Sequence, residues 1–208
     1  MVAQEKEMCD LERWKVAQKG DSDAFRVLYQ RYFNDIYLYL KRLCGDEELS
    51  KDTLQETFAD VWANRERLTI KSSVRNYLLV SSRRKMVEKL KQNRRFTDNY
   101  TDIRSQENLS VIFSHEDFIM DGELENSKNT LLAKALNSLP DRQREAVYLR
   151  FFKDMPYKEV ADVMGLTEKA AVNFVYKAFR KIRAEHAVDF IELAGWLSLL
   201  FSTLQLAG

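Results

Sequence analysis

Apolar residues recur every three or four positions along most of this chain, the spacing that places them on one face of an α-helix. The longest run starts after Ser22, which can cap a helix, and stops at Gly45, a residue type common just beyond helix ends. Its apolar face comprises Phe25, Leu28, Tyr29, Tyr32, Phe33, Ile36, Tyr37, Leu40, Leu43 and Cys44. The same spacing predicts helices over about 50–65 and 73–93, so we expect a helical bundle in the first half of the chain.

The helical spacing fades over about 96–129, where Asp, Asn, Ser and Glu accumulate, and we interpret this stretch as a linker between domains. Helical spacing returns at Leu131, and Pro140 suits the first turn of a helix that runs to about Phe152. No segment has the pattern of a strand, so the predicted fold class is all-α, with two helical domains joined by the linker. The expected boundaries are 10–95 for the first domain, 96–129 for the linker, 130–184 for the second domain and 185–208 for an apolar tail.

The stretch MGLTEKAAVNFVYKAFRKIR, residues 164–183, has the outline of a helix-turn-helix. Gly165 permits the turn, and Thr167 can cap the helix that follows. On a helical wheel the inner arc holds Ala171, Val175, Ala178, Phe179 and Ile182, and the opposite arc holds Lys169, Asn173, Tyr176, Lys177 and Arg180. This polar strip fits a major groove, with Asn173 reading bases and Lys177 and Arg180 contacting phosphates. The alternative is a plain amphipathic helix of an all-helical core.

Charge adds a second signal. The formal net charge is only +1, which by itself argues against a simple nucleic-acid binder, but the charges are segregated along the chain. Basic residues crowd together at Arg83, Arg84, Lys85, Lys89, Lys91, Arg94 and Arg95. Acidic residues dominate the predicted linker at Asp98, Asp102, Glu107, Glu116, Asp117, Asp121, Glu123 and Glu125. We therefore expect the linker to be acidic and the two segments to have separate tasks.

Two stripes of charge are predicted on neighbouring helices. Asp52, Glu56 and Asp60 lie at successive i, i+4 positions, where like charges repel, so we expect a basic protein surface to dock there. Arg84 and Lys91 fall close together on the next helix, and their density beside aromatic residues favours DNA contact. In both cases the alternative is a solubilising surface.

Catalytic and metal-binding patterns are missing from the sequence. Cys9, Cys44, His115 and His186 have no partners at ligand spacing, and no phosphate loop or nucleophile motif occurs, so we expect no metal, no cofactor and no enzymatic activity. The N-terminus has no apolar signal region, which indicates a cytoplasmic protein. The apolar run in the tail is shorter than the roughly 20 residues that a membrane span needs. We expect the tail to pack on the chain's own helices or a second copy, or else to bind a partner.

Four segments together resemble the extracytoplasmic-function (ECF) group of the sigma-70 family of bacterial RNA polymerase sigma factors. GDSDAFRVLYQRYFNDIYLYLKRL, DTLQETFADVWANRERL and SVRNYLLVSSRRKMVEKLK resemble successive parts of region two. LPDRQREAVYLRFFKDMPYKEVADVMGLTEKAAVNFVYKAFRKIR resembles region four. The resemblance covers about residues 10–95 and 130–184, in the order and at the separation typical of the family.

The resemblance implies a factor that binds core RNA polymerase, recognises and opens a promoter, directs transcription initiation, and has an anti-sigma factor as a further partner. The surface implied to bind core polymerase comprises Asp52, Gln55, Glu56 and Asp60. The loop Asn64 to Ser73 would capture a flipped base of the minus-ten element, and Glu168, Lys169, Asn173 and Lys177 would face the minus-thirty-five element. The complete predicted DNA-binding set is Asn64, Arg65, Arg83, Arg84, Lys85, Lys91, Arg95, Lys169, Asn173, Lys177 and Arg180.

Several positions depart from the family pattern. Many relatives have Asn and Asp where this chain has Arg84 and Glu88, and Ala170 replaces a hydroxyl residue. Val172 and Phe174 flank the polar strip, so we expect weak or unusual readout of the minus-thirty-five element. The alternative function is a helix-turn-helix regulator that dimerises through the apolar tail and acts without core polymerase. An enzyme acting on nucleic acid is a more distant alternative.

Overall fold

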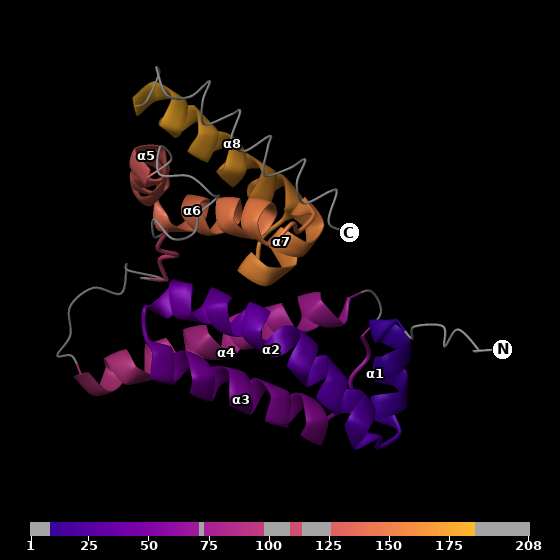
Figure 1. Cartoon of the computed structure of the whole chain (residues 1–208). Helices are drawn as coiled ribbons and strands as arrows, with labels where there is room; N and C mark the ends of the chain where they lie inside the picture. Colours follow the sequence, from indigo (N-terminus) through magenta and orange to yellow (C-terminus); the bar gives the residue numbers. More distant parts are fainter. Residues whose placement is uncertain (1–8, 71–72, 98–108, 114–125, 186–208) are drawn as a thin grey trace. The chain divides into compact units, whose positions relative to one another are not determined.

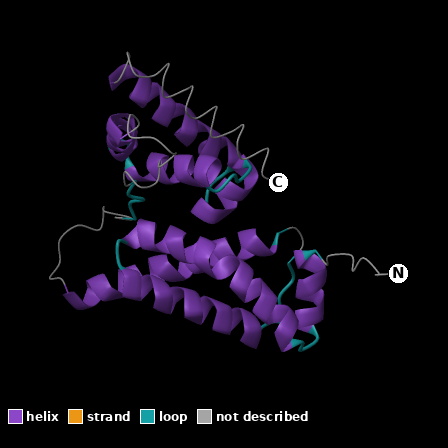
Figure 2. Ribbon diagram, in the orientation of Figure 1, coloured by secondary structure: helices purple, strands orange, loops and turns teal. Residues whose placement is uncertain are grey.

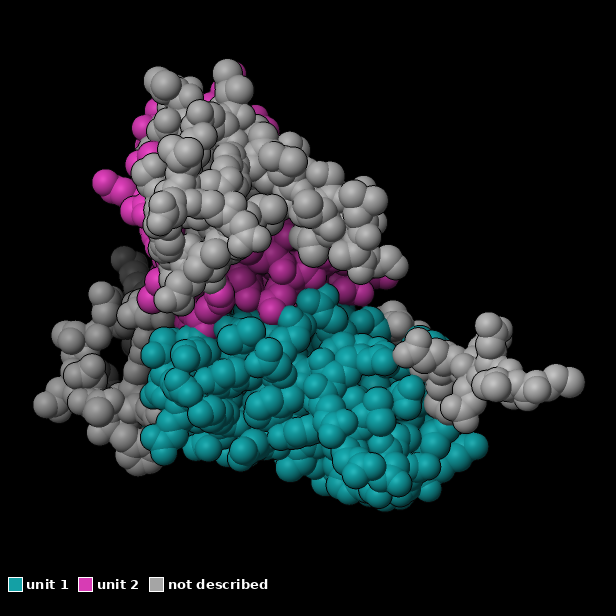
Figure 3. Space-filling model, viewed as in Figure 1, with its two compact units in different colours: residues 1–41, 45–104 teal, residues 42–44, 105–208 magenta. Residues whose placement is uncertain are grey.

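The computed structural model describes residues 9–70, 73–97, 109–113 and 126–185, with the side chains at 93–97 and 126–129 left out. Within these ranges every regular element is a helix (Figure 2), which confirms the predicted all-α class. The chain forms an N-terminal unit of residues 1–41 and 45–104 and a C-terminal unit of residues 42–44 and 105–208 (Figure 3). Most of the predicted acidic linker and the whole apolar tail after Glu185 lie outside the described residues.

The N-terminal unit is a helical bundle in which α3 and α1 both pack against α4 (Figure 1). Its helices are α1 (Asp10–Gln18), α2 (Ser22–Cys44), α3 (Glu47–Ala63) and α4 (Val74–Thr97). Its core holds Trp14, Leu28, Ile36, Tyr39, Leu40, Leu54, Leu78, Leu79 and Met86. Most of these residues belong to the apolar stripes seen in the sequence, so burial of those stripes accounts for the bundle.

Aspartates fix where the two central helices begin. Asp21, rather than the predicted Ser22, caps α2, because its carboxylate accepts a hydrogen bond from the Ala24 amide at 2.9 Å. Asp46 caps α3 through the Leu49 amide at 2.9 Å, so α3 begins three residues earlier than predicted. Gly45 adopts the left-handed conformation with φ 72°, as expected for the end of α2.

Helix α1 was not predicted from the sequence. Trp14 and Ala17 bury its inner face, and Gln18 at its end donates hydrogen bonds to the carbonyls of Arg65 and Leu68, at 3.0 and 2.7 Å. These bonds hold the loop that follows α3. The helix therefore fixes one of the segments that the sequence marked as functional.

In the described part of the C-terminal unit there are four α-helices and one π-helical turn. The elements are α5 (Asn126–Asn137), α6 (Asp141–Val147), η3 (Tyr148–Phe152), α7 (Tyr157–Met164) and α8 (Glu168–Glu185). The helix predicted from Pro140 does reach Phe152, but its last turn widens, and the Lys153 amide donates to the Tyr148 carbonyl at 3.2 Å. Helix α8 packs on both α6 and α7.

The turn between α7 and α8 has the predicted helix-turn-helix geometry. Gly165 lies in the left-handed region with φ 64°, and the next amide, Leu166, donates to the Ala161 carbonyl at 2.8 Å. Thr167 then caps α8, since its hydroxyl accepts from the Ala170 amide at 3.2 Å. These contacts fix the direction in which α8 leaves the turn.

Candidate functional site

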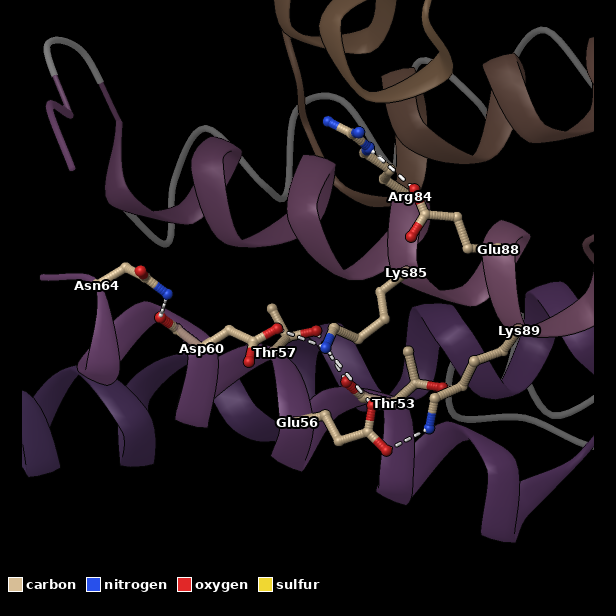
Figure 4. A network of polar contacts seen from close by, with 9 residues as sticks. All are labelled: Thr53, Glu56, Thr57, Asp60, Asn64, Arg84, Lys85, Glu88 and Lys89. Carbon is tan, nitrogen blue, oxygen red and sulfur yellow. Dashed lines mark hydrogen bonds and ion pairs between the residues drawn. The ribbon is translucent and has the colours of Figure 1, made fainter. Parts of the chain in front are cut away.

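The predicted acidic stripe lies on the exposed face of α3. Asp52, Gln55, Glu56 and Asp60 are all exposed. The structure adds partners for two of them, because α4 runs alongside and Lys85 and Lys89 reach across to α3 (Figure 4). Lys85 Nζ lies 2.5 Å from Asp60 and 3.4 Å from Glu56, and Lys89 Nζ lies 2.7 Å from Glu56. The predicted acidic and basic stripes therefore meet inside one unit.

These contacts shift the titration of the paired groups. The hydrogen bond from Lys89 lowers the pKa of Glu56 below its ordinary value, with both lysine charges adding to the effect. Partial burial works to lower the pKa of Lys85, but the hydrogen bond to Asp60 and the nearby carboxylates outweigh it and raise that pKa. Both shifts favour the charged forms, which keeps the network ionised at neutral pH.

The network corrects the electrostatic argument made from the sequence. Repulsion along α3 pointed to an external basic surface, but at Glu56 and Asp60 the chain supplies its own lysines. Asp52 differs, because no described side chain forms an ion pair or hydrogen bond with it. Only the Asp52 end of the stripe retains the uncompensated charge on which the docking argument depended.

An aromatic groove that the sequence did not reveal includes Gln55 of the predicted surface in its lining. It is a hollow of about 310 Å³ between α2 and α3, lined by Ser22, Phe25, Tyr29, Gln55, Phe58, Ala59 and Trp62. The Phe25 ring lies 5.0 Å from the Trp62 ring and 6.1 Å from the Phe58 ring. The helical spacing of the sequence places Trp62 on the inner face of α3, but the side chain is only half-buried and borders this groove. The spacing of four residues between Phe58 and Trp62 shows that both lie on one face of α3, but it does not show how much of that face is covered by other residues.

The predicted basic stripe on α4 divides into inward and outward residues. Arg83 is only 6% exposed, so its place in the predicted DNA-binding set is not supported by the fold. Arg84 is exposed and pairs with Glu88 at 3.1 Å, while Lys85 is turned toward α3 (Figure 4). Lys91 is exposed on the following turns. Arg95 lies in α4, but its side chain is outside the described set.

A pocket of about 230 Å³ lies between the end of α3 and the middle of α4. It is lined by Thr57, Asp60, Val61, Asn64, Leu68, Tyr77, Ser81, Arg84, Lys85 and Glu88. Asn64, predicted to contact DNA, is exposed at its rim and donates to the Asp60 carbonyl at 2.8 Å (Figure 4). Arg65 is instead stacked over Trp62, with its guanidinium 4.3 Å from the ring centroid.

The predicted strip on α8 is arranged as expected. Lys169, Asn173, Tyr176, Lys177 and Arg180 are all exposed. The opposite face is buried at Ala171, Val175, Ala178 and Ile182. A plain amphipathic helix would also expose its polar half; in α8 that half carries three exposed cations and the Asn173 amide.

No group of three or more metal-binding side chains occurs in the parts of the chain that the structure describes. Within the same parts, no helix is both long enough and apolar enough to span a membrane. His115 and His186 lie outside the described ranges, and Cys9 and Cys44 are not joined in a disulfide.

The two helical units correspond to two family models. Residues 28–96 match the model described as sigma-70 region 2, and residues 130–182 match the model described as sigma-70, region 4. The first match covers most of α2 and α4 and all of α3, and the second runs from within α5 to near the end of α8. The matched segments therefore contain every predicted site residue.

Relatives and solved structures agree with these matches. The chain is 30% identical over 166 residues to the ECF RNA polymerase sigma factor BldN of Streptomyces coelicolor, covering 80% of this chain and 61% of BldN. It is 24% identical over 157 residues to the ECF sigma factor SigM of Bacillus subtilis, covering 76% of this chain and 91% of SigM. The chain spans less than two thirds of the length of BldN but nearly all of SigM.

Two solved structures share the fold. The structure of CnrH, solved in complex with the cytosolic domain of CnrY, superposes with a TM-score of 0.57 at 22% identity, covering 86% of this chain and 98% of CnrH. RpoE of Bartonella quintana, solved with the anti-sigma factor NepR, gives a TM-score of 0.55 at 18% identity, covering 79% and 98%. Together with the two family matches, these findings identify the chain as a member of the sigma-70 family, within the ECF group of RNA polymerase sigma factors.

Proposed function

We propose that this ECF sigma factor binds core RNA polymerase through α2 and α3, holds melted promoter DNA between α3 and α4, and binds upstream duplex DNA with α8. The observation that carries the proposal is the exposed strip of Asn173 and its neighbouring cations on a capped helix after a glycine turn. The polymerase forms the RNA bonds, so the chain supplies binding and positioning, and we expect it to act in the cytoplasm without a catalytic step of its own.

The polymerase-binding surface combines one free acidic group with an apolar groove. Asp52 offers an uncompensated carboxylate, and Gln55 borders the groove formed with Phe25 and Trp62. A partner helix with aliphatic residues along one side and a basic residue beside them would fit this surface, because it buries apolar area and pairs one charge. Glu56 and Asp60 contribute by fixing α4 against α3 rather than by meeting the polymerase first.

The surface for melted DNA comprises the pocket between α3 and α4 and the cations beside it. The pocket has apolar walls at Val61 and Tyr77 and polar groups at its rim, including Asn64. Such a combination suits a base displaced from its stack, which needs a flat apolar contact and hydrogen-bond partners at its edge. Arg84 and Lys91 lie exposed on α4, where they can contact the phosphates of the same strand.

An anti-sigma factor is the second protein partner that we propose. CnrH and RpoE, which share the fold, were solved with CnrY and with the anti-sigma factor NepR. The aromatic groove between α2 and α3 is open in this chain and large enough for apolar side chains of such a partner. An independent helix-turn-helix regulator is not favoured, because it leaves the match of α2 to α4 with region 2 without a role.

The polymerase surface is tested by charge reversal at Asp52. Asp52→Lys should abolish co-purification with core RNA polymerase and promoter-dependent transcription, while the helical content and thermal unfolding of the chain stay unchanged. Glu48→Lys is the matched control, since it reverses an exposed carboxylate on the first turn of the same helix. Unchanged polymerase binding by Asp52→Lys, or equal loss in both variants, would reject this surface. Reversal of Glu56 is a poor test, because it places three cations together and disturbs the bundle.

A further inference from the structure

Two large apolar side chains lie exposed on the polar face of α8. Val172 is 40% exposed and Tyr176 is 64% exposed, and they are two of the five large hydrophobic residues with such exposure in the described part of the chain. They are one helical turn apart, and Asn173 lies to one side of them around the helix. Two adjacent exposed apolar side chains beside an amide need an explanation beyond chance exposure.

The packing of α8 holds these side chains in place. Ala171 and Val175 are buried on the inner face, so the adjacent Val172 is turned outward. Phe174 is fixed on the flank by Arg142 of α6, whose guanidinium lies 5.6 Å from the ring. Valine also has one strongly preferred rotamer in a helix, so its methyl groups are ordered before any ligand arrives.

The chemistry of this face matches an A·T pair in a major groove. An asparagine side chain can donate to and accept from adenine in the groove, and apolar side chains contact the methyl group of thymine. Lys169, Lys177 and Arg180 are exposed along the same helix, so this side of α8 attracts a polyanion. Glu168 in the first turn is the one exposed acidic residue beside it. A protein partner would also bury Val172 and Tyr176, but the three cations favour DNA.

We propose that Val172, with Tyr176 beside it, recognises thymine methyl groups next to an adenine bound by Asn173 in the upstream promoter element. The proposal rests on the proposed role of α8 and adds the chemical feature that the helix selects. The expected upstream element contains consecutive A·T pairs with thymine methyl groups facing Val172.

The test removes the methyl group from the DNA and the valine from the protein. Holoenzyme, assembled from core RNA polymerase and the full chain, first selects its preferred upstream sequence from random duplexes. Each thymine of that sequence is then replaced singly by deoxyuridine, which lacks only the methyl group, and binding is measured by fluorescence anisotropy. One or two replacements should weaken binding about three- to fivefold, as expected for losing one buried methyl contact.

Val172→Ala should weaken binding to the thymine duplex by a similar factor. At the position where deoxyuridine weakens binding by the unaltered protein, it should not weaken binding by Val172→Ala any further. Leu131→Ala is the matched control, because it truncates another exposed apolar residue of the same unit. It should change neither the affinity for the thymine duplex nor the loss of affinity caused by deoxyuridine. Equal sensitivity to deoxyuridine in Val172→Ala and the parent would overturn the proposal. So would intact DNA binding by Val172→Ala combined with weaker binding of a protein partner.

Failure of the proposed function would look different. If the holoenzyme selected no upstream sequence at all, the role of α8 in DNA binding would fall, and the methyl proposal with it. If it selected a sequence whose every thymine tolerates deoxyuridine, only the methyl proposal would fall.

Discussion

At the scale of single residues, Arg144 is an unusual buried cation in the C-terminal unit. Its guanidinium donates to the carbonyls of Val111 and Leu139, at 3.2 and 2.9 Å, and to the Asp141 carboxylate at 3.0 Å. Burial lowers the pKa of Arg144, and Asp141 partly opposes that shift. One side chain thus joins the segment 109–113 to both ends of the turn before α6. A guanidinium can do this because its donors are fixed in one plane.

Arg144→Met should therefore lower the free energy of unfolding of the chain by about 2–3 kcal/mol, because two buried carbonyls lose their charged donor. Denaturant unfolding followed by circular dichroism measures this value. Arg180→Met is the control, since Arg180 is exposed on α8 and its replacement should change the free energy of unfolding only slightly. Similar losses in the two variants would contradict the role assigned to Arg144.

The neighbouring arginines on α4 show how far the sequence identifies single site residues. Arg83 was grouped with Arg84 because the argument used the density of positive charge along the chain. The helical wheel held a better signal, since Arg83 lies four residues after Leu79 and three before Met86, both fully buried. The density of positive charge along the sequence could not show that Arg83 points into the bundle and Arg84 points outward. In contrast, the wheel for α8 placed each predicted residue on the exposed side.

At the scale of elements, a charged cluster joins the end of α2 to the start of α3. Glu47 lies 2.8 Å from Lys41 and 2.8 Å from Lys51, and the Tyr37 ring lies within about 6 Å of both ammonium groups. Hydrogen bonds from Lys41 and then Lys51 lower the pKa of Glu47 to about 2. The hydrogen bonds to Glu47 raise the pKa of each lysine.

The lowered pKa of Glu47 sets the sign of a pH dependence. Because the unfolded chain titrates near the ordinary value of about 4.3, the cluster should contribute fully above that pH and lose its contribution as pH falls toward about 2. The Glu47 carboxyl should titrate in NMR with a midpoint near 2. Lys41→Ala should move the midpoint upward, whereas Lys19→Ala, an exposed lysine beyond α1, should leave it in place. A midpoint near the ordinary value in the parent would exclude the cluster in solution.

The sequence predicted the long elements better than the short ones. Helices α2, α3 and α4 have apolar stripes that repeat over many turns, so their faces were visible. Helix α1 has only nine residues and two buried side chains, which is too little periodicity to detect. The widened turn Tyr148–Phe152, in which the Tyr148 and Phe152 rings stack at 5.7 Å, was also missed, because apolar spacing does not distinguish one π-helical turn from an α-helical one.

At the scale of the whole molecule, positive charge is divided among different tasks. Lys85 and Lys89 neutralise carboxylates of α3, whereas Lys91 on α4 and Lys177 on α8 are exposed without a partner among the described residues. The net charge of +1 therefore says little about affinity for DNA. What matters is which cations remain available on each unit.

Salt dependence distinguishes these tasks in the assembled holoenzyme. Lys91→Ala should weaken promoter binding for all sequences and reduce the slope of log K against log salt by about one, as expected for one lost phosphate contact. Asn173→Ala should relax sequence preference and leave the slope unchanged, since an amide releases no counterion. Affinities of both variants over a series of salt concentrations and two promoter sequences supply the measurement. Identical effects of the two variants would remove Asn173 as a base-reading residue.

The contact of one lysine with two carboxylates has an evolutionary consequence. If Lys85 were lost alone, Glu56 and Asp60 would remain as two like charges one turn apart, with only Lys89 beside them. Replacement of either carboxylate alone is milder, since Lys85 keeps the other. Mutational drift in descendants of this chain should therefore remove a carboxylate first and the lysine afterwards, so that these three positions covary.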